Sequence, residues 1–86
     1  MKDKTQARNT IEAALFSAEE PLSVRDLQSM FPGSCAPAPD DIRAMLDELT
    51  SDYADRGIEL VRVANGFRFQ TRQSYAQALR KLRESR

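Results

Sequence analysis

The stretch Ile58-Glu-Leu-Val-Arg-Val-Ala-Asn-Gly-Phe-Arg-Phe-Gln-Thr-Arg72 decides which fold this sequence predicts. Two runs rich in β-branched and aromatic residues flank Asn65-Gly66. That dipeptide favours a two-residue type I′ turn, because both central residues of such a turn have positive φ angles. The turn pairs Ala64 with Phe67, and we assign the face with both aromatic rings to the core. That face carries Ile58, Leu60, Arg62, Ala64, Phe67 and Phe69.

A first helix is predicted over about residues 5–18, well before the hairpin. Four apolar residues recur there at intervals of three and four, which places them on one helix face. They are Ile11, Ala14, Leu15 and Ala18. Phe16 lies about 100° around the helix from Leu15 and is the large apolar side chain outside this stripe.

A second helix is predicted to begin after Ser23, with Asp26 completing a capping box and Pro32-Gly33 ending the helix. Leu22, just before it, is expected in a short strand beside the hairpin. The apolar side of this helix holds Val24, Leu27, Met30 and Phe31.

A third helix is predicted after a proline loop at residues 34–39, beginning at Asp40 or Asp41. It ends at Arg56-Gly57, where Gly57 is expected to adopt a left-handed conformation. Its apolar stripe comprises Ile42, Met45, Leu46, Leu49 and Tyr53.

A fourth helix is predicted over about residues 73–84, after the hairpin, with four apolar side chains directed inward. They are Tyr75, Ala78, Leu79 and Leu82. Three helices, an Asn-Gly hairpin and a C-terminal helix together predict an α+β winged helix-turn-helix domain over residues 1–86. Winged helices either bind nucleic acids or dock proteins, so the remaining residues must distinguish these two functions.

The charge of the chain is divided along its length, although the net charge is zero. Residues 1–59 hold six basic and twelve acidic residues, a net charge of −6. Residues 60–86 hold seven basic residues and one acidic residue, a net charge of +6. This division favours self-association or a partner of mixed charge.

Several function classes find no support in the composition. No apolar run approaches the roughly 20 residues that span a bilayer, and the first residues lack the apolar segment of a secretory signal. Cys35 is the single cysteine and there is no histidine, so neither a zinc site nor a cysteine–histidine nucleophile is expected. We therefore expect a cytoplasmic protein that is not an enzyme and takes no cofactor, metal or small-molecule substrate.

The third helix occupies the position of a recognition helix, but its charge opposes DNA binding. Residues 40–55 hold six acidic residues against Arg43 alone. A helix in the major groove lies close to phosphates on both flanks, and uncompensated acids there cost kcal/mol even in water. The acids also suit a solvated face, and both interpretations argue against insertion into the groove.

Two sets of surface residues are candidate partner contacts. Phe16, Met30 and Phe31 are candidate dimer or protein contacts. Alternatively, Phe16 packs under the wing or the last helix, and Met30 and Phe31 close the bottom of the core. The second set would contact phosphates in a DNA-binding alternative. Otherwise its members would solubilise the domain, form salt bridges to the acidic half of the chain, or face the acidic helix of a second copy. It comprises Arg62, Arg68, Arg72, Arg80, Lys81 and Arg83.

Two segments in this order resemble a known family. They are Ile11-Glu-Ala-Ala-Leu-Phe-Ser-Ala-Glu-Glu-Pro-Leu-Ser23 and the hairpin from Gly57 to Arg72, with Tyr53 and Arg56-Gly57 at the matching positions between them. Together they resemble the first winged-helix domain of segregation and condensation protein B, ScpB, over about residues 8–83. The proline loop is longer than a minimal helix-turn-helix turn, which is unlike many DNA-binding proteins.

The resemblance implies a non-enzymatic subunit of the bacterial SMC–kleisin (condensin) complex, associated with the nucleoid. Its implied partners are a second copy of itself, the kleisin ScpA and, through ScpA, the SMC ATPase, with DNA contacted mainly indirectly. Members of the family look like two winged helices in tandem. The single winged helix here is therefore expected to be the N-terminal part of a two-domain protein.

Overall fold

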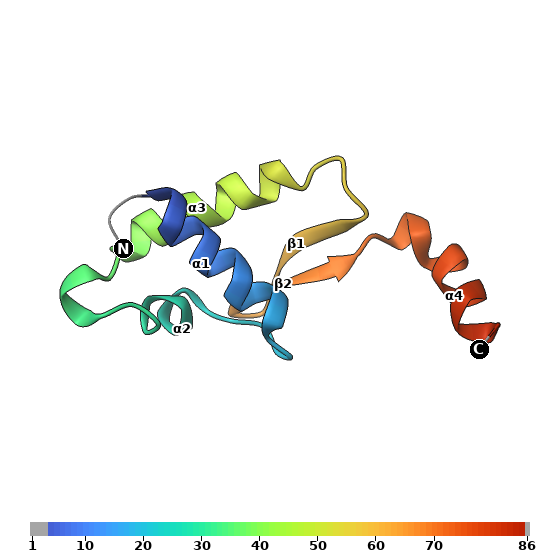
Figure 1. Ribbon diagram of the computed structural model, residues 1–86, viewed down its shortest axis with the longest axis horizontal. Helices are drawn as coiled ribbons and strands as arrows, with labels where there is room; N and C mark the ends of the chain where they lie inside the picture. Colours follow the sequence, from blue (N-terminus) through green and yellow to red (C-terminus); the bar gives the residue numbers. More distant parts are fainter. Residues whose placement is uncertain (1–3, 86) are drawn as a thin grey trace.

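The structure is a computed structural model that describes residues 4–85. The first and third helices pack against a two-stranded hairpin, the second helix packs on the third, and a fourth helix extends away from this body (Figure 1). The elements are α1 (Lys4–Ser17), α2 (Val24–Gln28), the 3₁₀ turn η1 (Gly33–Cys35), α3 (Pro39–Asp52), β1 (Ile58–Val63), β2 (Gly66–Thr71), the 3₁₀ turn η2 (Gln73–Tyr75) and α4 (Ala76–Glu84). The predicted α+β winged-helix fold is confirmed.

The core lies between α1, α2, α3 and the hairpin. Four side chains in it are fully buried, namely Ile11, Leu27, Ile42 and Leu46. Leu60 of β1 is buried with them, and Phe67 and Phe69 of β2 pack against the cluster. Burying each large aliphatic side chain contributes about 1.5–3 kcal/mol, so the stripes on α1 and α3 supply most of the packing energy.

The predicted capping box at the start of α2 is confirmed. The backbone N–H of Asp26 donates to Ser23 Oγ at 3.0 Å, and the N–H of Ser23 donates to Asp26 Oδ2 at 2.9 Å. The helix ends at Gln28, earlier than the predicted end at Pro32-Gly33. It ends early because Met30 and Phe31 donate to the carbonyls three residues before them, which tightens the last turn.

Helix α3 begins and ends earlier than the sequence predicts. Pro39, not an aspartate, is its first residue, since a proline there has no N–H to leave unsatisfied. The predicted loop before it contains η1. The predicted left-handed Gly57 is wrong, because no described glycine has a positive φ. The carbonyls of Tyr53 and Ala54 at this end accept hydrogen bonds from Arg72 instead.

The hairpin turn is one residue earlier than predicted. Val63 pairs with Gly66, so the two loop residues are Ala64 and Asn65, and Ala64 has a φ of 50°. The predicted pairing of Ala64 with Phe67 is therefore wrong. Every strand residue changes its partner by two positions, which preserves side-chain alternation. The core face accordingly keeps the predicted strand residues and loses only Ala64, which lies in the turn.

Gly66 is required by a neighbouring segment rather than by the turn. A Cβ atom at Gly66 would lie 2.8 Å from the Cβ of Pro21 and 3.2 Å from the backbone nitrogen of Leu22. Leu22 and Phe67 exchange two backbone hydrogen bonds of 2.9 and 2.8 Å, which confirms that Leu22 lies beside the hairpin. The close crossing of this segment places the glycine in β2 instead of the turn.

Helix α4 does not direct its apolar side chains into the core, contrary to the prediction. Tyr75 is 49% exposed, Leu82 is 53% exposed, and no residue of α4 is buried. The chain leaves β2 away from the three-helix body, so α4 projects beyond the hairpin (Figure 1). Its apolar side therefore faces solvent in a single copy of the chain.

Candidate functional site

Phe16 forms the centre of an exposed apolar surface on α1. Its side chain is 77% exposed and lies between two surface hollows of about 360 and 250 Å³. Phe69 lines both hollows, and Leu15 and Ile58 line the larger one. Acidic residues also line the hollows, namely Glu12, Glu19 and Glu20. We call Phe16, these apolar neighbours and the three glutamates the Phe16 surface.

Helix α4 carries a second exposed apolar surface. Leu79 and Leu82 are three residues apart and share one side of the helix, and Tyr75, the last residue of η2, precedes Leu79 by four residues. Leu79 is only partly buried, and the other two are half exposed. Lys81 and Arg83 lie in the last turn of the helix, on either side of Leu82 in the sequence. We call Tyr75, Leu79 and Leu82 the α4 face.

The other two predicted apolar contacts lie apart from these surfaces. Phe31 is 6% exposed and belongs to the core, which corresponds to the alternative of closing the core. Met30 beside it is 41% exposed. Of the three apolar residues singled out in the sequence, Phe16 therefore presents the largest accessible side chain.

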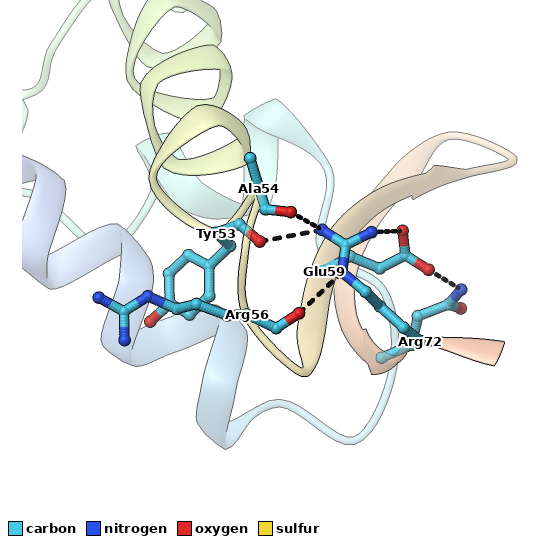
Figure 2. A network of polar contacts seen from close by, with 6 residues as sticks. Tyr53, Ala54, Arg56, Glu59 and Arg72 are labelled. Carbon is cyan, nitrogen blue, oxygen red and sulfur yellow. Dashed lines mark hydrogen bonds and ion pairs between the residues drawn. The ribbon is translucent and has the colours of Figure 1, made fainter. Parts of the chain in front are cut away.

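Arg72 binds the end of α3 instead of projecting from the wing (Figure 2). Its Nη2 donates to the carbonyl oxygens of Tyr53 and Ala54 at 2.9 and 3.2 Å, and its Nε donates to that of Arg56 at 2.8 Å. Its Nη1 forms a 3.1 Å ion pair with Glu59. A guanidinium engaged by four partners joins the helix terminus to the hairpin and is not available to a phosphate.

The remaining basic candidates do not form one continuous surface. Arg62 lies on the core face of the hairpin, opposite Phe67, whereas Arg68 lies on the other face, opposite Val61. Arg80, Lys81 and Arg83 lie on α4, which projects away. The structure therefore does not bring the six candidate phosphate contacts together.

A third hollow, of about 590 Å³, lies between α2, α3 and the hairpin and collects three arginines that the sequence distributes over separate elements. They are Arg25, Arg43 and Arg62. Arg43 forms a 3.0 Å ion pair with Asp40, and Asp47 lines the same hollow. Nothing in the sequence spacing indicates that Arg25 and Arg43 lie near Arg62, because tertiary packing alone brings them together.

The acidic character of α3 is retained in the structure. Arg8 pairs with Glu48 at 2.7 Å, and Arg43 pairs with Asp40. Asp41, Asp47 and Asp52 are exposed and form no ion pair among residues 4–85. The exposed side of this helix would therefore repel a phosphate backbone.

Tyr53 joins the end of α3 to α1. Its hydroxyl donates to the carboxylate of Glu12, and its ring lies 4.9 Å from that of Phe69. The guanidinium carbon of Arg56 lies 5.4 Å from the centre of the Tyr53 ring. The hydrogen bond to Glu12 raises the pKa of Tyr53 above its usual 10.0, and burial and the charge of Glu12 raise it further.

This pKa shift predicts a loss of stability in alkali. Because folding raises the pKa, the folded state holds the tyrosine proton more tightly than the unfolded state. The resulting stabilisation is complete below about pH 10 and is lost as pH rises through the higher folded pKa. Urea unfolding from about pH 9 to about pH 11 should show a steeper fall for the natural chain than for Tyr53→Phe. Equal slopes would contradict the assignment.

The described residues offer no cluster of three or more histidine, cysteine, aspartate or glutamate side chains that could hold a metal ion. Cys35 is an exposed free thiol. Within the described part of the chain, no helix is long and apolar enough to cross a membrane.

Comparison with known proteins identifies the family. Residues 9–86 match the family described as "Segregation and condensation complex subunit ScpB". The chain belongs to the ScpB family. The family resemblance predicted from the two sequence segments is thereby confirmed.

Individual ScpB proteins match most of the chain. The "Segregation and condensation protein B homolog" of Coxiella burnetii (strain RSA 493 / Nine Mile phase I) is 41% identical over 76 residues, which are 88% of this chain and 36% of that protein. The "Segregation and condensation protein B" of Syntrophotalea carbinolica (strain DSM 2380 / NBRC 103641 / GraBd1) is 33% identical over 98% of this chain and 42% of its own length. The chain thus spans about 36–42% of the length of these relatives.

Solved ScpB structures share the fold. The crystal structure of ScpB from Mycobacterium tuberculosis superposes with a TM-score of 0.85 at 23% identity, over 99% of this chain and 52% of that one. A second crystal structure, a dimer of ScpB N-terminal domain complexed with ScpA peptide, gives a TM-score of 0.79 at 27% identity. It covers 94% of this chain and 92% of the other, so the described elements correspond to nearly all of that N-terminal domain.

Proposed function

We propose that this chain is a non-enzymatic assembly domain of the bacterial SMC–kleisin complex, which acts in chromosome condensation and segregation. In this proposal it homodimerises and binds the kleisin ScpA, and through ScpA the SMC ATPase. The observation that carries the proposal is the exposed Phe16 surface, an aromatic side chain between two hollows on a domain whose α3 repels nucleic acid. Exposed aromatic anchors of this kind often centre protein interfaces.

The family and one structural neighbour support the same function. The ScpB family is described as a complex subunit, and the neighbouring N-terminal domain was solved as a dimer with a ScpA peptide. We infer further that the chain is the N-terminal domain of a two-domain protein. Its place would then be in the cytoplasm at the nucleoid, with DNA contacted mainly through the rest of the complex.

Size-exclusion chromatography with light scattering tests the dimer. At tens of micromolar, the chain of 9.7 kDa should elute with about twice its monomer mass. Titration with a peptide from the cognate ScpA should give saturable heat in calorimetry. A strictly monomeric chain would contradict homodimerisation, and an absence of heat would contradict kleisin binding by this domain.

DNA binding is the second candidate, favoured by the exposed Arg62, Arg68, Arg80, Lys81 and Arg83. It predicts fluorescence anisotropy changes with duplex DNA that fall by decades between low and physiological salt, if many phosphates are engaged. Because Arg72 is engaged with α3, Arg72→Ala would act on that binding only through stability. No anisotropy change at low salt would exclude this candidate.

A further inference from the structure

We propose that the α4 face of one copy docks on the Phe16 surface of a second copy, and that the two copies exchange their α4 helices reciprocally. This docking rests on the homodimerisation proposed above, and it specifies the two surfaces that form the dimer interface. It assigns α4 as the arm and Phe16 as the centre of the receiving surface.

Among the described residues, the large exposed apolar side chains are Phe16, Met30, Tyr75 and Leu82. All of these except Met30 belong to the Phe16 surface or the α4 face. Phe16, Tyr75 and Leu82 are each about half exposed or more, and they lie on different elements. Figure 1 shows α4 extending past the hairpin, away from α1. Within one copy the α4 face therefore meets no element that could cover it, and the Phe16 surface stays uncovered as well.

The charges beside the two surfaces are complementary. Glu12, Glu19 and Glu20 line the hollows around Phe16, and Glu19 and Glu20 form no ion pair among residues 4–85. At about 100° per residue, Arg83 lies on one side of the α4 face and Lys81 on the other. Arg68 also lines the larger hollow, so the surface around Phe16 carries three glutamates and one arginine and keeps an excess of negative charge. A helix that carries basic residues thus meets a mainly acidic surface, which favours this orientation over contact between two identical surfaces.

A second copy is the occupant that these observations favour. Both complementary surfaces are present on the same chain, so a two-fold axis satisfies both at once. One short helix in a hollow is a small contact, whereas specific interfaces bury about 1,200–2,000 Å² in total. Reciprocal exchange forms the contact twice, which brings the buried area of a nine-residue helix closer to that requirement.

Disulfide trapping between two differently tagged chains tests the exchange. Both carry Cys35→Ser; one also carries Ala13→Cys, at a position that lines the smaller hollow beside Phe16, and the other Ala78→Cys, about 60° around the helix from Tyr75. These positions leave Phe16, Leu79 and Leu82 in place. After mixing and mild oxidation, the mixed disulfide between the two tags should form faster than either disulfide between identical chains. Gln77→Cys, about 200° around the helix from Tyr75, is the matched control and should trap little.

The outcomes separate this inference from the function on which it rests. A mixed disulfide that forms with the cysteine at the α4 face, but little with Gln77→Cys, supports the exchange. A dimer that traps no mixed disulfide, or traps Gln77→Cys equally well, overturns the exchange and leaves homodimerisation standing. A chain that stays monomeric in light scattering overturns both.

Affinity measurements provide a test that does not depend on oxidation. Phe16→Ala should raise the dimer dissociation constant at least about 30-fold, as expected for a central aromatic anchor. Glu19→Arg with Glu20→Arg, or Lys81→Glu with Arg83→Glu, should each raise it about tenfold. All four changes in one chain should restore most of the affinity. If the combined chain is weaker than either pair alone, the charge pairing is wrong.

Discussion

Replacing Arg72 with alanine is expected to lower the free energy of unfolding by about 2–3 kcal/mol. The substitution removes a charged donor from the carbonyls of Tyr53, Ala54 and Arg56 and leaves Glu59 without its ion pair. Since a guanidinium at a helix C-terminus also opposes the negative end of the helix dipole, α3 loses its terminal stabilisation. For a domain of this size the melting temperature should fall by roughly 10–20 °C.

Chemical and thermal denaturation measure this effect. Arg25→Ala is the matched control, because Arg25 is exposed and forms no ion pair among residues 4–85, so it should change stability by less than about 0.5 kcal/mol. Arg72→Lys should recover only part of the loss, because an ammonium cannot reproduce the guanidinium fork. Equal stability of Arg72→Ala and Arg25→Ala would show that the network contributes nothing.

The second large effect is expected at the hairpin. Gly66→Ala should destabilise the fold by about 1–3 kcal/mol, because the new Cβ would lie 2.8 Å from Pro21 and the crossing segment must shift. Ala64→Gly should do the opposite and stabilise by a few tenths to about 1 kcal/mol, since it relieves a positive φ at a non-glycine residue.

The two substitutions together distinguish the observed turn from the predicted one. With Asn65-Gly66 at the tip, Ala64 would lie in a strand, and glycine there would destabilise the hairpin. Urea midpoints of both variants decide the matter. A loss of stability in Ala64→Gly would contradict the turn at Ala64-Asn65.

The elements that the sequence predicts well are those set by local patterns. The stripe with Ile11 and Leu15 and the box of Ser23 and Asp26 depend on residues three or four apart, where helical geometry fixes the contact. The family resemblance followed from the order of such segments. The core face of the hairpin is predicted correctly although the turn is not, because a shift of the register by two residues leaves each side chain on the same face of the strand.

The features that the sequence missed depend on distant contacts. Asn-Gly is a strong local signal for a turn, so the sequence places Gly66 at the tip. In the structure Gly66 lies in β2, where the close approach of Pro21 leaves no room for a side chain. Arg72 is a candidate phosphate contact in the DNA-binding alternative because the sequence shows the basic wing but not the carbonyl groups that bind this side chain. Its ion pair with Glu59 agrees with the other interpretation, a salt bridge to the acidic half of the chain. The inward side of α4 was predicted from periodicity, which indicates an apolar face but not whether the same chain covers it.

A helix of nine residues without a buried side chain has consequences for how the chain assembles. Helices this short are marginal in water when packing does not support them. Part of the order in α4 must then come from whatever it binds, and the entropy of ordering is subtracted from the affinity. In the proposed dimer, assembly through such an arm should therefore be readily reversible and sensitive to the concentration of the protein.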